Sequence, residues 1–312
     1  MKVTVLLPVY NAGPPLDVAL ASVIDQTFKD YEILVIDDAS TDDSLARIRR
    51  FEKLSPRIQV IAHEKNRGLS TSLNEGLGAA RGAYIARMDQ DDESLPERLA
   101  TQAAFLDNNP DCAVVGSFVY HMGATRTVDR LVSLPIAADE IAATLPRYNC
   151  MYHPSVMLRR ETILALGGYR EQFRNAEDYD LWLRVSRSHR LANIPEPLLR
   201  YRFSTSGMSL GRKWEQLYFV YLAQAAHGNP DTGLDELERL AKDQLAKTDR
   251  QGFLASVMRG TFDELSALHL WRDASRLIWR FRREIGNRRT LAEVRDIGRR
   301  YLRTWVTASR PP

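Results

Sequence analysis

Short apolar runs alternate with amphipathic segments over the first 90 residues, and this alternation constrains the fold more than any other feature. Four runs are rich in β-branched and apolar side chains and predict buried strands: residues 3–10, 31–38, 58–62 and 82–88. Three segments between them carry apolar side chains at helical spacing: residues 16–26, 44–54 and 69–80. This order predicts an α/β fold with a mainly parallel, doubly wound sheet and right-handed crossovers.

An acidic cluster, Asp89, Asp91 and Asp92, follows the fourth predicted strand. In an open α/β sheet, ligands bind outside the carboxyl ends of the strands. Carboxylates this close repel one another unless a cation neutralises them. Mg²⁺ and Mn²⁺ prefer oxygen ligands, usually one or two carboxylates together with substrate phosphates. The cluster predicts either a metal–diphosphate site or an acidic turn that caps the next helix, because residues 92–97 also have N-cap chemistry.

Polar groups also follow the first two strands. Pro8, Tyr10 and Asn11 end the first, and Asp38 ends the second. A doubly wound sheet gathers these ends around one crevice. There Tyr10 can stack on a base, and Asp38 can accept hydrogen bonds from a uracil or thymine imide and from a ribose. No dinucleotide-binding glycine fingerprint follows the first strand and no P-loop occurs, so we expect a metal to meet the phosphate charge.

The composition fits an intracellular protein with one large core, alone or with an appendage. The chain has 312 residues, is 44% hydrophobic and carries a net charge of +3. Cys112 and Cys150 form no disulfide framework and are expected to be small buried residues in a reducing compartment. We find no signal peptide and no apolar run near the roughly 18 residues that span a bilayer. We expect a cytoplasmic protein, or one held peripherally on the inner face of the plasma membrane.

Charge is concentrated at the C-terminus. Residues 266–312 contain 12 arginines against four acidic residues, a local charge of +8, so the remainder of the chain carries −5. Within this tail an apolar stripe lies between arginines: Leu270, Ala274, Leu277, Ile278, Phe281 and Ile285. A basic amphipathic helix of this kind can lie on an anionic membrane surface. The alternative, that the stripe packs on the rest of the protein, is equally compatible with the pattern.

From residue 3 to about 209 the chain resembles the family 2 glycosyltransferases, inverting enzymes of the GT-A fold. The resemblance rests on motifs in the family's order: residues 3–11, 26–42, 66–74, the Asp89-Gln90-Asp91 DxD motif, 153–160, 167–169 and 176–184. It implies a Rossmann-like, mainly parallel central sheet flanked by helices in a domain of residues 1–209. Residues 210–312 lie outside the resemblance and have the pattern of a helical C-terminal extension, which associates with a membrane or a partner or packs on the domain.

The resemblance also implies roles for individual residues. Asp178 is the expected catalytic base, with Glu177 and Asp180 as the next candidates. Asp91 is the expected direct ligand of Mn²⁺ or Mg²⁺, with Asp89 nearer the ribose or the metal's water shell. The donor site is expected to contain the following residues: Pro8, Tyr10, Asn11, Asp38, Arg67 and Asp89. On pattern alone, Glu177 and Asp178 would be read as acids that complement a helix dipole.

Several side chains have two interpretations. Arg67 and Arg87 either contact phosphate or are solvated surface residues, and His153 either reaches the diphosphate or is structural. Trp182 is expected in the core. Relatives often read Tyr-Arg-x-His where this chain has Ser204 in place of the histidine. If that histidine binds metal or diphosphate, this protein works without it.

The predicted function is metal-dependent, inverting transfer of a sugar from a UDP- or dTDP-sugar to a saccharide acceptor. The acceptor is expected to belong to a bacterial surface polysaccharide or its lipid-linked precursor. A nucleotidyltransferase is one alternative, but it would need a Gly-rich basic loop where residues 11–15 stand. A non-catalytic scaffold that binds sugar nucleotide or membrane is another. Nucleic acid is not an expected partner, because the basic tail contains no recognised module.

Overall fold

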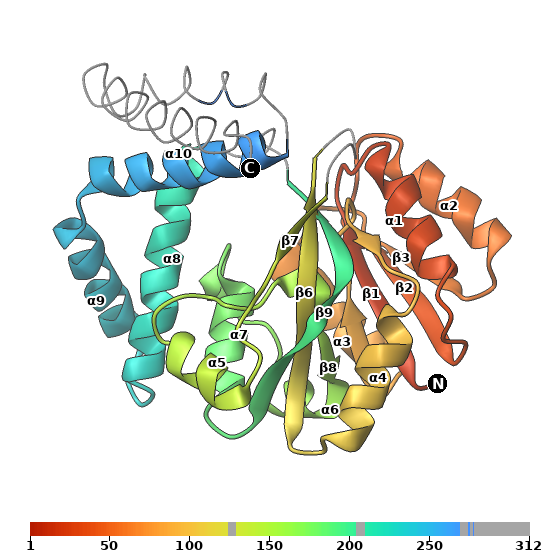
Figure 1. Cartoon of the computed structure of the whole chain (residues 1–312), viewed down its shortest axis with the longest axis horizontal. Coiled ribbons are helices and arrows are strands. Elements are labelled where there is room, and N and C mark those ends of the chain that lie inside the picture. Colours follow the sequence, from red (N-terminus) through yellow and green to blue (C-terminus); the bar gives the residue numbers. More distant parts are fainter. Residues whose placement is uncertain (124–128, 204–209, 269–273, 275–276, 278–312) are drawn as a thin grey trace, which may run out of the picture.

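One mixed sheet runs through the computed structural model in Figure 1, which describes residues 1–123, 129–203, 210–268, 274 and 277. The strand order is β3-β2-β1-β4-β8-β6-β9-β5, and β7 pairs with β6. The strands are β1 (Val3–Val9), β2 (Tyr31–Asp37), β3 (Ile58–Ala62), β4 (Tyr84–Arg87), β5 (Glu93–Ser94), β6 (Cys112–Met122), β7 (Asp129–Val132), β8 (Met157–Arg159) and β9 (Arg190–Arg202).

Ten α-helices lie in the described part of the chain. They are α1 (Pro15–Ile24), α2 (Ser44–Leu54), α3 (Leu69–Ala79), α4 (Arg98–Asn108), α5 (Ala138–Thr144), α6 (Arg160–Ala165), α7 (Glu177–Val185), α8 (Leu210–Gly228), α9 (Leu234–Lys247) and α10 (Arg250–Ala267). The predicted β-α-β-α order is confirmed, with small differences at the element ends. β1 lies parallel to both β2 and β4, so the carboxyl ends of these three strands share one edge.

The core has two layers because side chains alternate across the sheet. On β1, Leu6 faces the layer formed with α3, α5, α6 and α7. Its neighbours Val5 and Leu7 face the layer formed with α1, α2 and α4. Burial of strand residues on both faces explains why these runs read as continuously apolar rather than alternating.

The longest strand, β9, was not predicted from the sequence. It contains Pro195 and Pro197, which lack the N–H that a sheet ladder needs and normally exclude a central strand. β9 accommodates them where its parallel register with β6 shifts, around Phe118 opposite Pro197. The short strands β5 and β7 were also missed. β5 begins at Glu93 and α4 only at Arg98, so Glu93 and Ser94 enter the sheet. Glu97 occupies the N-cap position of α4 but makes no side-chain capping hydrogen bond.

The first helices after residue 209 share the main core. Leu222 and Ala223 of α8 are buried in the same cluster as Trp182 of α7, and Figure 1 shows α8, α9 and α10 grouped at one side of the sheet. Trp182 is therefore a core residue, as predicted. The division of the chain at residue 209 stays a prediction.

Most of the predicted membrane-binding stripe lies outside the described residues. Its two described members, Ala274 and Leu277, are buried in a cluster with Leu254, Ala255, Met258 and Leu265 of α10. In the described segments, no helix has both the length and the apolar character needed to cross a bilayer.

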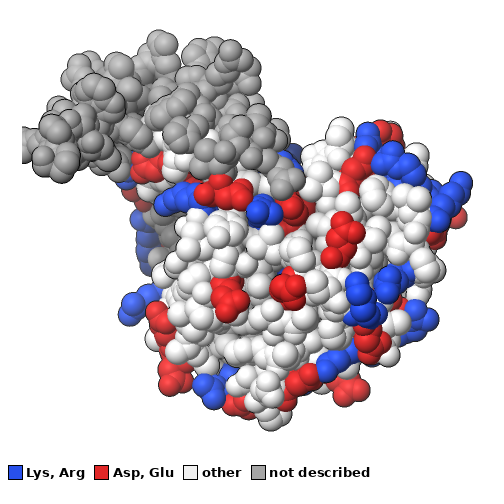
Figure 2. Space-filling view, turned by 45° about the vertical axis from the view of Figure 1, so that its right-hand side comes forward, with Lys and Arg blue, Asp and Glu red and all other residues white. Residues whose placement is uncertain are grey.

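Charges of both signs are interspersed on the face shown in Figure 2, around a broad uncharged area. The most unusual charges are instead those buried at the sheet edge, such as Arg87, Asp92 and Arg98. Ionised groups rarely lose their contact with water unless they are paired or functional, so these buried charges mark this edge as a candidate site.

Candidate active site

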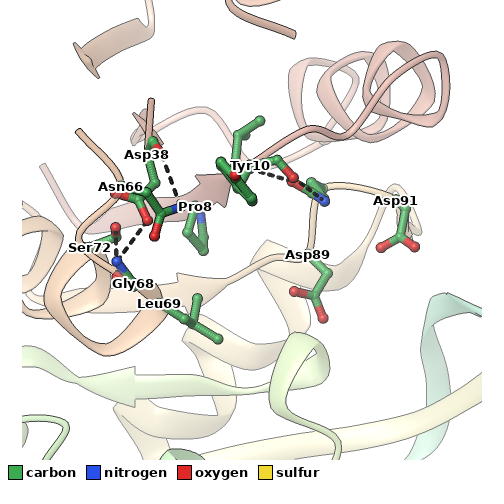
Figure 3. A pocket seen from close by; sticks show the side chains of 11 residues that line it. Pro8, Tyr10, Asp38, Asn66, Gly68, Leu69, Ser72, Asp89 and Asp91 are labelled. Atoms are coloured by element: carbon green, nitrogen blue, oxygen red, sulfur yellow. Dashed lines mark hydrogen bonds between the residues drawn. The ribbon is translucent and has the colours of Figure 1, made fainter. Parts of the chain in front are cut away.

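A pocket of about 520 Å³ lies at the carboxyl ends of β1, β2 and β4, and we call it the edge pocket. Figure 3 shows side chains from all three strand ends turned toward it. Five of the residues singled out from the sequence line it: Pro8, Tyr10, Asp38, Asp89 and Asp91. Asn66, Gly68, Leu69 and Ser72 complete much of the wall. The predicted convergence of the three strand ends is therefore present.

The buried carboxylate of Asp38 organises one wall of the edge pocket. It accepts hydrogen bonds from the backbone N–H groups of Arg67 (2.7 Å) and Gly68 (2.8 Å). Gly68 has φ +86°, a conformation that a residue with a side chain adopts only with strain. His63 contacts Asp38 through Nδ1 (2.7 Å) and Glu75 through Nε2 (3.1 Å). The Asp38 side chain is thus held rigidly where it meets the pocket.

Tyr10 also lines the edge pocket, and 45% of this residue is exposed. Its backbone is clamped by Gln90, whose Oε1 accepts from the Tyr10 N–H (2.7 Å) and whose Nε2 donates to the Tyr10 carbonyl (3.2 Å), as Figure 3 shows. An exposed ring on a fixed backbone suits stacking against a planar base.

Two predicted donor-site residues do not line the edge pocket. Asn11 instead fixes the following loop, because its Oδ1 accepts from the Thr41 N–H (2.7 Å) and its own N–H donates to Ser40 Oγ (3.0 Å). Arg67 pairs with Glu75 (2.5 Å) and lines a neighbouring groove of about 380 Å³. Asn11 therefore supports the site from behind, and the Arg67 side chain lies beside it.

The three aspartates of the acidic cluster have different environments. Asp89 is ion-paired with Arg87. Burial and the Asp89 carboxylate raise the pKa of Asp91 to about 6. Asp92 is fully buried and accepts from the Arg202 N–H (2.7 Å), and its second oxygen has no hydrogen-bond partner among the described residues. Burial and both neighbouring carboxylates raise the pKa of Asp92 well above its ordinary value. Asp92 therefore anchors the cluster to β9.

The donor set of the edge pocket fits a hard divalent cation. Asp89 and Asp91 both line it with carboxylate oxygens, and a cation would relieve the repulsion that raises the pKa of Asp91. Within the described residues, no group of three or more His, Cys, Asp or Glu side chains is placed to hold a metal. Two carboxylates completed by substrate phosphate oxygens are the usual arrangement for Mg²⁺.

A second pocket of about 510 Å³ adjoins the first, and Leu69 and Asp89 line both. We call it the α7 pocket because Glu177 and Asp178, in the first turn of α7, form part of its wall. His153, Tyr201 and the buried Arg87 also line it. A substrate that fills the edge pocket can thus extend past Asp89 toward the two α7 carboxylates.

Asp178 is held as a hydrogen-bond acceptor. Its Oδ1 accepts from the Tyr179 N–H (2.7 Å) and its Oδ2 accepts from Asn149 Nδ2 (2.9 Å). Burial raises the pKa of Asp178 despite these bonds. Burial and the charge of Asp178 also raise the pKa of Glu177. A carboxylate with a raised pKa is a stronger base, so this pair suits proton abstraction.

Asp180 does not face the α7 pocket. Its carboxylate is buried between Arg170 and Arg184, with 3.0 Å between Arg184 Nε and Asp180 Oδ2, and it lines a separate small cavity. Of the three acids in this turn, only Glu177 and Asp178 are positioned to meet a substrate in the α7 pocket.

Arg87 differs most from the sequence interpretation. One of its two interpretations was a solvated surface position, yet only 3% of Arg87 is exposed. Its place in a four-residue strand with both neighbours apolar was the signal for burial. His153 is also buried, bonds Tyr169 through Nε2 (2.9 Å), and has its pKa lowered well below the ordinary value by burial and by nearby Arg87.

Other wall residues come from segments without a recognisable motif. Arg212, Lys213 and Gln216 lie on α8. Asn149, which donates to Asp178 but does not itself line the pocket, lies in the loop after α5. Nothing in their local sequence connects them with the strand ends, because tertiary packing alone brings α8 to the pocket. The predicted departure at Ser204 lies outside the described residues.

A nucleotide-sized pocket at the carboxyl ends of parallel strands, opening past a DxD motif to a second carboxylate pair, defines a GT-A glycosyltransferase. The model for glycosyl transferase family 2 matches residues 4–166, and the chain belongs to this family.

Relatives support this assignment. A glycosyltransferase of Haemophilus influenzae is 33% identical over 212 residues, which is 64% of this chain and 65% of that protein. The amylovoran biosynthesis glycosyltransferase AmsE of Erwinia amylovora is 32% identical over 230 residues, 70% of this chain and 85% of AmsE. The match spans somewhat less than two thirds of the first relative and most of the second.

Solved structures share the fold. TarS from S. aureus, solved in complex with UDP, aligns over 96% of this chain and 92% of its own with a TM-score of 0.59 at 20% identity. The mannosyltransferase PcManGT from Pyrobaculum calidifontis, solved with GDP-Man and Mn²⁺, aligns over 94% and 86% with a TM-score of 0.58 at 17% identity. At these identities the likeness concerns the fold.

Proposed function

We propose that this glycosyltransferase moves a sugar, with inversion and with a divalent metal, from a UDP- or dTDP-sugar to a saccharide acceptor of surface polysaccharide synthesis. The observation that carries the proposal is the junction of the two pockets at Asp89. The edge pocket has room for a nucleotide, and the α7 pocket has room for a sugar and the attacking hydroxyl group. The relative AmsE, named for amylovoran biosynthesis, supports the polysaccharide role.

In this proposal the edge pocket binds the nucleoside diphosphate. Tyr10 stacks on the base, and Asp38 meets the base or ribose from the other wall. Asp91 is the metal ligand, and Asp89 lies beside it next to the ribose or the metal's water shell. A Mn²⁺ or Mg²⁺ ion bound there supplies charge stabilisation for the departing diphosphate. Mn²⁺ in the PcManGT complex supports this choice of cofactor.

The α7 pocket holds the proton-transfer machinery. Asp178 removes the proton from the acceptor hydroxyl as that oxygen attacks the anomeric carbon, and base catalysis of this kind contributes roughly 10²–10⁴-fold. Asn149 and the Tyr179 N–H hold both carboxylate oxygens, so the side chain keeps one orientation. His153 is neutral and bonded to Tyr169, which gives it a positioning role in the wall.

The protein acts in the cytoplasm or at the inner face of the plasma membrane in this proposal. The basic tail would provide membrane contact through its arginines, while Ala274 and Leu277 are already buried against α10. Sedimentation with anionic liposomes tests this contact, and a chain without residues 278–312 is expected to stay in the supernatant. Equal binding by both chains would contradict membrane contact by the tail.

Calorimetry tests the donor site directly. Purified protein is titrated with UDP, dTDP, GDP and CDP, first with Mn²⁺ and then with EDTA. We expect either UDP or dTDP to bind, and to bind only in the presence of the metal. Binding of none of the four would favour the alternative of a non-catalytic scaffold, and equal binding in EDTA would remove the metal from the proposal. Release of UDP from a UDP-sugar in the same samples then separates a transferase from a scaffold.

A further inference from the structure

A lysine of α8, Lys213, lines the α7 pocket and forms no ion pair with a carboxylate in the described part of the chain. Lys213 is half-buried, and its Nζ donates to Gln216 Oε1 (3.0 Å). Within residues 1–123, 129–203 and 210–268, no carboxylate forms an ion pair with it. Lys213 is partly removed from water by the surrounding residues, and this burial lowers the pKa of its ammonium group. A partly desolvated cation gains most when a ligand brings the missing negative charge.

The position of Lys213 is set by contacts between α8 and α7. Gln216 accepts a hydrogen bond from the Lys213 ammonium at Oε1. Its Nε2 donates to the backbone carbonyl of Asn175 (3.0 Å), which lies just before α7 begins. The same helix places Arg212 at the wall of this pocket. Lys213 is therefore fixed beside the turn that carries Asp178.

The charges around the α7 pocket leave room for an anion on the α8 side. Three carboxylates line this pocket, and two of them already have partners: Asp89 pairs with Arg87, and Asp178 accepts from Asn149. Glu177, the third, has its pKa raised by burial and by Asp178. None of the residues that line the edge pocket in the described structure comes from α8. The α8 cations thus face the acceptor side of the junction.

We infer that Lys213 is the centre of a phosphate-binding subsite in the α7 pocket, which takes a phosphate group carried by one of the two substrates. A compact ammonium with three donors binds phosphate as a point charge, and Arg212 lines the same pocket. The phosphate belongs either to a phosphorylated or lipid-diphosphate-linked acceptor or to the donor diphosphate. The inference rests on the proposed function, which identifies this pocket as the meeting point of donor and acceptor.

Calorimetry with small probes tests the subsite without requiring transfer. Glucose 1-phosphate and methyl glucoside are titrated into the full chain in EDTA, so that no metal mediates the contact. We expect glucose 1-phosphate to bind at least about tenfold more tightly than methyl glucoside, and Lys213→Gln to remove this difference. Lys213→Arg should keep it, and so should the control Lys247→Gln on the exposed surface of α9.

A repeat with saturating UDP and Mn²⁺ identifies the source of the phosphate. Lys213-dependent binding of glucose 1-phosphate that persists beside UDP assigns the subsite to the acceptor. Competition by UDP, with Lys213→Gln weakening UDP itself about tenfold, assigns it to the donor diphosphate. Both results support the subsite.

Unchanged binding of glucose 1-phosphate and UDP by Lys213→Gln would overturn the subsite. Tighter binding of glucuronate than of glucose 1-phosphate would overturn its assignment to phosphate. A wild-type chain that binds no nucleoside diphosphate but shows Lys213-dependent phosphate binding would contradict the proposed function and leave the subsite standing. Lys213→Gln should unfold at the wild-type temperature or above it, because it removes a partly buried charge that no carboxylate among the described residues balances.

Discussion

The guanidinium of Arg87 is ion-paired with the carboxylate of Asp89 where the edge pocket meets the α7 pocket. The same guanidinium lowers the pKa values of Asp91, Glu177 and Asp178 through its charge, although burial raises all three. One buried cation therefore acts on both carboxylate groups of the site.

Arg87→Met should move the acidic limb of the transfer rate to higher pH. Without the positive charge, Asp178 and Glu177 hold their protons to a higher pH, so the ionised base is lost earlier as pH falls. Rates measured between pH 5 and 9 show this shift. Arg87→Lys should keep most of the limb in place, and Arg49→Met, on the surface of α2, should not move it. An unchanged acidic limb in Arg87→Met would show that the charge of Arg87 does not affect the pKa of the base.

Metal-dependent binding of UDP should weaken as pH falls through about 6. Burial and Asp89 raise the pKa of Asp91 to about 6, and a protonated carboxyl group is a poor metal ligand. Asp91→Asn should remove the metal-dependent part of the affinity at every pH. Calorimetry with Mn²⁺ between pH 5 and 8 measures both effects. An Asp91→Asn protein with the wild-type metal response would place the metal elsewhere.

Asp178→Asn should bind the donor normally and lose roughly 10²–10⁴-fold in transfer rate, since the amide cannot accept the acceptor proton. Glu177→Gln is the matched neighbour and should retain far more of the rate. The two variants are compared by UDP calorimetry and by single-turnover transfer. If their rates are reversed, Glu177 is the base and Asp178 tunes it.

Tyr10→Ala should weaken UDP binding about tenfold, because stacking of an aromatic ring on a base contributes roughly 1–3 kcal/mol. Tyr10→Phe keeps the ring and should bind as the wild type does. Tyr148→Ala, an exposed tyrosine beyond α5, is the control for loss of any surface aromatic. An unchanged affinity in Tyr10→Ala would show that the base lies against another wall.

Asp180→Asn should destabilise the fold by about 3 kcal/mol without removing the proposed base. The substitution leaves the charges of Arg170 and Arg184 without their buried partner, and the energy lies at the low end for such pairs because Arg170 is one third exposed. Urea unfolding measures the loss, and UDP calorimetry below the transition should give the wild-type affinity. A normal stability with abolished transfer would instead make Asp180 part of the chemistry.

Much of the site could be read from the sequence because its parts follow strands with strong local patterns. Asp38 and Asp89 each follow an apolar run that forms a strand. Parallel packing of β1, β2 and β4 brings the carboxyl ends of these strands together. The same reasoning also predicted Asn11 at the pocket, but its side chain turns to the neighbouring loop instead. Position at a strand end predicts nearness to a pocket, but hydrogen bonds to the next loop decide which side chain faces it.

The order of strands and helices in the first half of the chain, and the gathering of Tyr10, Asp38 and Asp91 at one edge, follow from the local patterns of apolar residues, because pleat and helix periods are local properties. The path of β9 and the arrival of Lys213 at the α7 pocket depend on contacts between residues far apart in the chain. The three acids of α7, Glu177, Asp178 and Asp180, also depend partly on local pattern and partly on tertiary contacts. Their spacing is local, but only the placement of Arg170 and Arg184 separates Asp180 from Asp178, because burial and ion pairing arise when distant segments pack together.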